Sequence, residues 1–119
     1  MRRPSAAANR HDMMDELIIE PREVYDMMQR GVKFLLLDCR EPWEYQTARI
    51  EGAMLIPMRQ IPQKLDDLPK DQPVVVYCHA GVRSFDTASW LKQQGMDAVS
   101  MSGGIDRWSM EIDPKVPRY

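Results

Sequence analysis

Two short, near-continuous apolar runs set the strongest limit on how this chain folds. Residues 33–38 and 73–77 lack the alternation of apolar and polar side chains that marks a strand with one face in water. Such runs are typical of strands that are covered on both faces of a parallel sheet. Shorter strands are expected at residues 17–19, 54–57 and 98–101. Together these segments provide the strands of one sheet.

Segments with helical character separate these strands. One is expected to begin at Pro21, which suits the first position of a helix, and to end at Gly31. Further helices are expected at residues 61–68, at residues 84–94 and directly after Gly103 and Gly104. Strands that alternate with helices predict an α/β fold with a mainly parallel sheet. Ligands of such sheets bind beyond the carboxyl ends of the strands.

The chain of 119 residues is long enough for one domain with a single core. Its start is basic, but no apolar stretch of secretory length follows, so it does not make a signal peptide. We therefore expect a flexible N-terminal leader at residues 1–15 and one domain at residues 16–119. A weak organelle address is the alternative interpretation of the leader.

Composition excludes several classes of function. The net charge of −2 gives no general case for a nucleic acid or a membrane as partner. No apolar run approaches the roughly 20 residues that span a bilayer. The two cysteines have neither a paired spacing nor a cluster with histidine, which argues against a disulfide framework and a zinc site. We expect a cytoplasmic protein with no metal and no cofactor.

A cysteine on a short turn is the strongest chemical signal in the chain. The segment Cys78-His79-Ala80-Gly81-Val82-Arg83-Ser84 joins the buried strand at residues 73–77 to a helix. The first N–H groups of a helix have no partner within it, and the helix dipole favours negative charge there. Arg83 adds a full positive charge, and Gly81 allows the backbone angles of a tight anion cradle. Such surroundings lower a cysteine pKa from about 8.5 to roughly 3.5–7.5, so Cys78 is a candidate nucleophile.

The alternative is that Cys78 is an ordinary core residue. Most isolated cysteines are small buried hydrophobic side chains. A structural cysteine, however, does not need a glycine, an arginine and a hydroxyl residue on the polar turn that follows it. The surrounding residues therefore favour the reactive interpretation.

Four segments, in this order, carry a resemblance to a known family. They are Asp38-Cys39-Arg40-Glu41-Pro42-Trp43-Glu44-Tyr45, Ile50-Glu51-Gly52-Ala53-Met54-Leu55-Ile56-Pro57, the Cys78 loop, and Gly103-Gly104 followed by Trp108. They are similar to the Asp-x-Arg…Glu-Phe/Tyr, Ile-x-Gly-Ala-x-x-Ile-Pro, Cys-x-x-Gly-x-Arg-Ser and Gly-Gly-x-x-x-Trp motifs of the family. From about Ile18 to Tyr119 the chain resembles a single-domain rhodanese-like sulfurtransferase. Arg49 is a departure, because many members have histidine there, and it concerns local packing.

The resemblance implies a central, mainly parallel five-stranded sheet flanked by helices on both faces, with the Cys78 loop over its carboxyl edge. It implies that Cys78 takes a sulfane sulfur from thiosulfate or a similar small anionic donor and holds it as a persulfide. Cyanide, a thiol or a protein acceptor then removes the sulfur. The oligomeric state stays open. The expected substrate-binding residues are His79, Ala80, Gly81, Val82, Arg83 and Ser84.

Individual roles follow for this loop. Its N–H groups are expected to hold the charge of the terminal sulfur, as an oxyanion hole holds oxygen. Arg83 is expected to attract the anionic end of the donor. We expect Ser84 to cap the helix, and the alternative is that its hydroxyl hydrogen-bonds to the anionic end of the donor. His79 is expected to be a solvated loop residue without an acid–base role.

The loop after residues 33–38 supplies possible pocket or support residues, namely Asp38, Arg40 and Trp43. We expect Arg40 to form a structural ion pair with a nearby carboxylate. Trp43 either lines the mouth of the pocket or packs as an ordinary side chain. Cys39 is expected to lie close to Cys78, since the family order makes the two preceding strands neighbours. It is either a buried residue in place of the family's usual valine or a resolving thiol that forms a disulfide with Cys78 under oxidation.

Two other functions fit part of the pattern. Phosphatases and arsenate reductases also use cysteine and arginine around an anion cradle, but tyrosine-type phosphatases place one residue more between them than the four found here. The shorter loop suits a single sulfur atom, and it contains no Asp to act as a general acid. A non-catalytic binding module on the same fold usually lacks the cysteine, whereas this chain has both Cys78 and Arg83.

Overall fold

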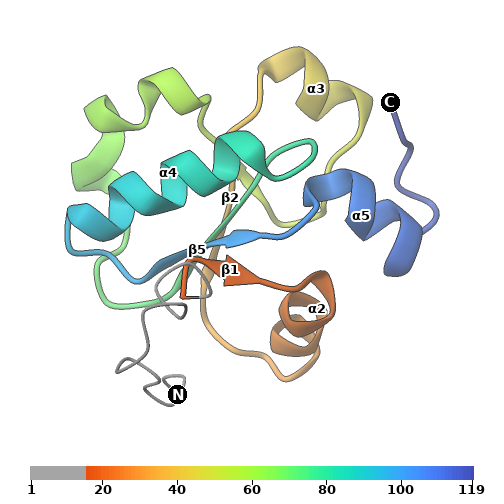
Figure 1. The fold of residues 1–119 in the computed structure, drawn as a ribbon, viewed down its shortest axis with the longest axis horizontal. Coiled ribbons are helices and arrows are strands. Elements are labelled where there is room, and N and C mark those ends of the chain that lie inside the picture. The colour runs from red at the N-terminus through yellow and green to blue at the C-terminus, as the bar shows by residue number, and fades with distance from the viewer. Residues whose placement is uncertain (1–15) are drawn as a thin grey trace.

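The computed structural model describes residues 16–119, and the predicted leader at residues 1–15 lies outside them. Its five strands are β1 (Ile18–Ile19), β2 (Leu35–Asp38), β3 (Met54–Leu55), β4 (Val74–Tyr77) and β5 (Ala98–Met101). They form one sheet in the order β1-β5-β4-β2-β3, and every pairing is parallel. The predicted α/β fold with a central parallel sheet is confirmed (Figure 1).

Among residues 16–119, four α-helices and two 3₁₀ segments connect or follow the strands. They are α2 (Pro21–Gln29), α3 (Pro42–Thr47), α4 (Val82–Gln93), α5 (Gly104–Glu111), η2 (Met58–Gln60) and η3 (Pro62–Asp67). Helix α3 was not expected, and the predicted helix at residues 61–68 is a 3₁₀ segment. Helix α4 begins two residues earlier than predicted, because Gly81 serves as its N-cap.

Helices α2 and α3 begin with the same local pattern, Glu-Pro-x-Glu. In α3 the Glu41 N–H donates to Glu44 Oε1 at 2.9 Å, and in α2 the Glu20 N–H donates to Glu23 Oε1 at 3.1 Å. The proline needs no N–H partner at the first helical position, where none exists within the helix. This pattern starts a helix directly after β2 and so fixes where Glu44 lies.

The sheet separates two apolar clusters, which accounts for the near-continuous apolar strands. Helix α4 and the 3₁₀ segments cover one face, and α2 and α5 cover the other. Figure 1 shows α4 and α2 on opposite sides of the sheet. Strand β4 is buried throughout. No helix among residues 16–119 has the length and apolar character needed to cross a membrane.

Strands β2 and β4 are neighbours, with Asp38 in register with Tyr77. Because the two strands are parallel, the loops that follow them leave from the same edge of the sheet. The loop after β4 begins with Cys78, and the loop after β2 begins with Cys39. This edge brings together the residues that sequence analysis selected from two distant parts of the chain.

Candidate active site

The turn between β4 and α4 holds the Cys78 sulfur against backbone donors. Gly81 has φ +105°, which side-chain-bearing residues rarely adopt, and this conformation turns the chain into α4. The N–H groups of Gly81 and Ser84 donate to Cys78 Sγ at 3.1 Å and 3.3 Å. A cradle of N–H groups at a helix start stabilises a thiolate over a thiol. The predicted anion cradle is therefore present, and it encloses the sulfur itself.

A second helix fixes the loop from the opposite side. The N–H groups of Ile105 and Asp106, in the first turn of α5, donate to the carbonyls of Cys78 at 2.9 Å and His79 at 3.1 Å. The approach is so close that a side chain at Gly104 would overlap these two carbonyl groups. Helix α5 thus sets the position of the cysteine backbone, while α4 supplies donors to its sulfur.

A chain of buried hydroxyl groups continues from the sulfur. Cys78 Sγ and Ser84 Oγ share a hydrogen bond of 3.3 Å, and Ser84 Oγ lies 2.7 Å from Ser100 Oγ on β5. When the sulfur is ionised, the Ser84 hydroxyl donates to it and Ser100 is able to donate to Ser84. The prediction that Ser84 caps the helix is therefore wrong. The helix begins at Val82, so Ser84 lies inside its first turn and faces the sulfur.

The thiol of Cys39 is the remaining neighbour of the sulfur. Both cysteines are free thiols in the same apolar cluster, and each is only 1% exposed. The hydrogen bond from Cys39, together with the donors on Ser84 and Gly81, outweighs burial and lowers the Cys78 pKa to about 5. The same hydrogen bond and burial raise the Cys39 pKa. Cys78 is the thiolate of the pair because it receives the backbone donors.

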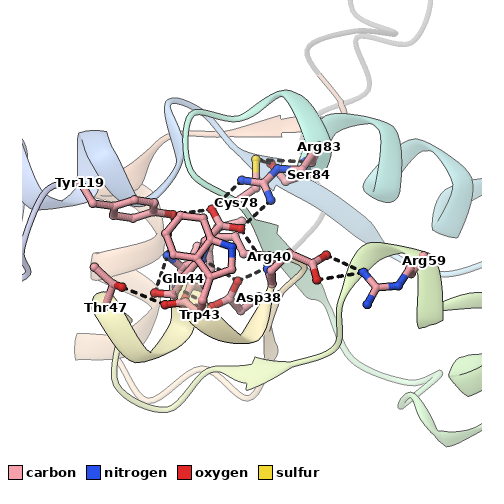
Figure 2. A network of polar contacts seen from close by, with 12 residues as sticks. Asp38, Arg40, Trp43, Glu44, Thr47, Arg59, Cys78, Arg83, Ser84 and Tyr119 are labelled. Carbon is pink, nitrogen blue, oxygen red and sulfur yellow. Dashed lines mark hydrogen bonds and ion pairs between the residues drawn. The ribbon is translucent and has the colours of Figure 1, made fainter.

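Arg83 points to a carboxylate in this structure. Its two terminal nitrogens donate to the two oxygens of Glu44 at 2.8 Å and 2.9 Å (Figure 2). Burial alone would raise the Glu44 pKa, but hydrogen bonds from Arg83, from the Glu41 backbone and from Tyr119 hold it at about 2. The Arg83 side chain is 35% exposed and that of Glu44 is 5% exposed. The pair joins the Cys78 loop to helix α3.

A fully buried ion pair supports the loop after β2. The Arg40 guanidinium donates to Asp38 at 2.9 Å and 2.7 Å, and both side chains are 0% exposed. The Tyr77 hydroxyl donates to Asp38 at 3.0 Å, and the Ala48 carbonyl accepts from Arg40 at 2.6 Å. The predicted structural role of Arg40 is confirmed. Asp38 and Arg40 shape the scaffold under the site.

Tyr119 ties these groups together from a distant part of the chain. Its hydroxyl donates to Glu44 Oε2 at 2.8 Å and accepts from Arg40 at 2.8 Å. Its ring stacks on that of His79 at 4.1 Å and meets Trp43 edge-on at 5.8 Å. His79 is half-buried by this stacking, and Trp43 is 61% exposed beside it.

A surface hollow among residues 16–119 lies away from Cys78. A hollow of about 330 Å³ lies between the end of α3 and residues 113–117, and Cys78 does not line it. Cys78 is itself only 1% exposed. Among residues 16–119, no group of three or more His, Cys, Asp or Glu side chains is arranged to hold a metal ion.

Sequence reasoning missed two residues of this site, Ser100 and Tyr119, and the contact between Glu44 and Arg83. Glu44 itself stands in one of the family motifs, but its partner lies on a distant loop. Ser100 was visible only as a hydroxyl residue in an otherwise apolar strand. Tyr119 lies 75 positions from Glu44, and local patterns do not predict such a contact.

Comparisons with known proteins match this architecture. A family model for the rhodanese-like domain matches residues 20–111. A crystal structure of a rhodanese-related protein from Thermoplasma volcanium has a TM-score of 0.75 at 30% identity, over 85% of this chain and 97% of that one. The thiosulfate sulfurtransferase GlpE of Glaesserella parasuis is 34% identical over 91 residues, which are 76% of this chain and 83% of that protein.

A longer relative matches over only part of its length. The probable adenylyltransferase/sulfurtransferase MoeZ of Mycobacterium tuberculosis is 39% identical over 104 residues. These are 85% of this chain and 26% of that protein. The chain therefore spans about a quarter of the length of this relative.

Proposed function

The chain belongs to the rhodanese-like domain family of sulfurtransferases, and from this we propose that it moves a sulfane sulfur from thiosulfate, or a similar anionic donor, to a thiol or cyanide through a persulfide on Cys78. One observation carries the proposal. The Cys78 sulfur accepts two backbone N–H groups and has a pKa of about 5, so it is a thiolate at neutral pH. The match to a named thiosulfate sulfurtransferase supports thiosulfate as the donor.

In the first step the Cys78 thiolate attacks the outer sulfur of thiosulfate. A bond forms between the two sulfur atoms, and the bond to the sulfonate sulfur breaks, with its electron pair leaving on sulfite. Cys78 then carries the added sulfur as a persulfide anion. The N–H groups of Gly81 and Ser84, which already hold the sulfur of Cys78, are placed to hold charge in this cradle.

Arg83 is the residue that we assign to the anionic end of the donor. Two of the five guanidinium N–H groups point to the Glu44 oxygens, and the side chain is still 35% exposed. The donor sulfonate therefore competes with, or shares, the Glu44 contact. Movement of Arg83 is also one way to open the covered sulfur to a donor.

In the second step a nucleophile removes the outer sulfur. Cyanide gives thiocyanate, and a thiol gives a new persulfide, with the electron pair of the broken sulfur–sulfur bond returning to Cys78 as thiolate. We place the reaction in a reducing compartment such as the cytoplasm, because the two cysteines have no paired spacing of a disulfide framework.

Intact-protein mass measurement after exposure to thiosulfate tests the proposal. Measured directly after exposure, the protein should carry the mass of one added sulfur atom, which a reductant removes. Cys78→Ser should gain nothing, whereas Cys39→Ser, the matched removal of the neighbouring thiol, should still gain the sulfur. An unchanged adduct on Cys78→Ser would refute the assignment. Hydrolysis of p-nitrophenyl phosphate in place of sulfur transfer would favour the phosphatase alternative.

A further inference from the structure

Cys39 and Cys78 occupy paired positions just beyond β2 and β4. Asp38 is in register with Tyr77, and the Cys39 N–H donates to the Tyr77 carbonyl at 3.1 Å, in the pattern of the parallel ladder below it. Continued by one residue beyond the ends of the strands, this register sets Cys39 opposite Cys78. Neighbouring strands lie about 4.8 Å apart, and disulfide-linked cysteines have Cα atoms roughly 4.4–6.8 Å apart. The two backbones stand at a separation that a disulfide accepts.

The side chains also project from the same face of the sheet. Successive side chains of a strand alternate between faces, and Leu37, Cys39, Val76 and Cys78 all belong to the cluster under α4. Both thiols lie in this buried cluster, and each is a cause of the shift in the pKa of the other. A second sulfur therefore lies beside the atom to which the proposed function attaches the transferred sulfur.

We propose that Cys39 is a second catalytic thiol, which attacks the inner sulfur of the Cys78 persulfide, forms a Cys39–Cys78 disulfide and releases the transferred sulfur as hydrosulfide. This step rests on the proposed function, since it starts from the persulfide. The chemical class of its product is inorganic sulfide, formed without an external thiol in the bond-breaking step.

Atoms and electrons balance within the pair. A lone pair of Cys39 Sγ forms the new bond to Cys78 Sγ, and the bond between Cys78 Sγ and the outer sulfur breaks with its electrons on the outer sulfur. The proton of Cys39 passes to that sulfur, which leaves as hydrosulfide. The sulfane sulfur is reduced and the two thiols are oxidised to a disulfide. A dithiol reductant then restores the two cysteines by thiol–disulfide exchange.

The charge on Cys78 keeps Cys39 protonated, and so unreactive, until Cys78 carries the transferred sulfur. In the resting site the hydrogen bond with Cys78, burial and the Cys78 charge all raise the Cys39 pKa. In the persulfide the charge moves to the outer sulfur, one atom farther from Cys39. The hydrogen bond to Cys78 and the repulsion by its charge both weaken, while burial stays the same. Cys39 therefore releases its proton more readily once Cys78 carries the persulfide.

Single-turnover chemistry without added thiol tests the step. Wild type, Cys39→Val and Cys39→Ser are loaded with excess thiosulfate and freed of small molecules, and both released sulfide and intact mass under non-reducing conditions are followed. Wild type should release one sulfide per chain and end two hydrogens lighter than the reduced protein. Both variants should keep the added sulfur. Cys39→Val removes the thiol but keeps an apolar side chain for packing, and Cys39→Ser removes the thiol but keeps a small polar side chain. Circular dichroism reports whether each variant is folded.

The outcomes separate the two proposals. If the adduct on wild type persists as long as the adduct on both variants and no sulfide appears, Cys39 does not resolve the persulfide, and the proposed function still stands. If no protein acquires sulfur, the proposed function fails and this step falls with it. Treatment of wild type with diamide tests the geometry alone, and absence of a Cys39–Cys78 linkage would overturn the placement of the thiols.

Discussion

The loops that follow β2 and β4 begin with a cysteine each, at paired positions and with equal burial, yet they give the two thiols opposite ionisation. After β4, the N–H groups of Gly81 and Ser84 turn back onto the Cys78 sulfur. After β2, the N–H groups of Arg40 and Glu41 donate to the carboxylates of Asp38 and Glu44. The first loop directs its donors to a sulfur, and the second directs them to its own scaffold.

The difference shows that burial alone does not decide how a cysteine behaves. Removal from water raises the pKa of both thiols, since it disfavours the charged form. For Cys78, hydrogen-bond donors that point to the sulfur lower the pKa by more than burial raises it. Four experiments test this difference between the loop after β2, which supports the scaffold, and the loop after β4, which carries the reactive thiol.

The largest effect is expected on stability from the scaffold loop. Arg40→Leu leaves the fully buried Asp38 carboxylate without its partner, which costs about 3–5 kcal/mol of unfolding free energy for buried ion pairs. Urea unfolding measures the loss. Arg59→Leu is the matched control, because its ion pair with Glu41 lies at the surface and its removal should change little. Equal losses in the two variants would show that the buried pair is not the support we describe.

The next effect is expected on catalysis from the reactive loop. Gly81→Ala forces a side chain onto a residue at φ +105° and brings its Cβ to 3.1 Å from the Gly103 nitrogen. Displacement of a donor from the cradle should slow thiosulfate:cyanide turnover on the order of a hundredfold to a thousandfold, as for loss of an oxyanion-hole donor. Gly52→Ala is the control, with φ +91° and open space around the added Cβ. A similar loss of turnover in the control would assign the effect to backbone strain in general.

A third experiment detects the ionisation of Cys78 from the pH dependence of the unfolding free energy. Its pKa is about 5 in the folded chain and about 8.5 in an unfolded chain. Between these values the unfolded state binds more protons, so stability should rise with pH. The unfolding free energy of wild type relative to Cys78→Ala should therefore increase from pH 5 to pH 8.5, by at most about 1.4 kcal/mol per pH unit. A difference that is flat with pH would mean that Cys78 stays protonated.

The smallest effect is expected from the outer end of the hydroxyl chain. Ser100→Ala removes the group 2.7 Å behind Ser84 and should raise the midpoint pH of Cys78 alkylation by less than about one unit, as fits the loss of one neutral hydrogen bond. Iodoacetamide labelling across pH measures the midpoint. Ser109→Ala is the control, since its buried hydroxyl bonds to the Val116 carbonyl instead. An unchanged midpoint for Ser100→Ala would confine the support of the sulfur to Ser84.

The same contrast explains what sequence could predict. The reactive loop was found because its signal is local: a cysteine, a glycine and an arginine lie within six residues of one another, between a buried strand and a helix. The parallel sheet was found because burial on both faces leaves a near-continuous apolar run. Both follow from residues that are adjacent in the chain.

The features that sequence reasoning missed depend on tertiary contacts or on the residue at which a helix begins. Ser84 was assigned to a helix cap, yet Gly81 starts the helix earlier and turns the hydroxyl toward the sulfur. Arg83 was expected to face a donor, and its bidentate contact with Glu44 appears only when two loops are brought to one edge of the sheet. Tyr119 enters the site across most of the length of the chain.

The contact between α5 and the Cys78 loop means that Cys78 becomes reactive only after α5 has folded onto the loop. The carbonyls of Cys78 and His79 are held by N–H groups that belong to residues 105 and 106. During synthesis, Cys78 emerges well before these residues, and until they fold onto the loop its backbone lacks this anchor. A nascent or partly unfolded chain should therefore carry a thiol of ordinary acidity, sluggish toward peroxides and alkylating agents at neutral pH. Reactivity would arrive together with completed folding, which shields the nucleophile from damage while the chain is still immature.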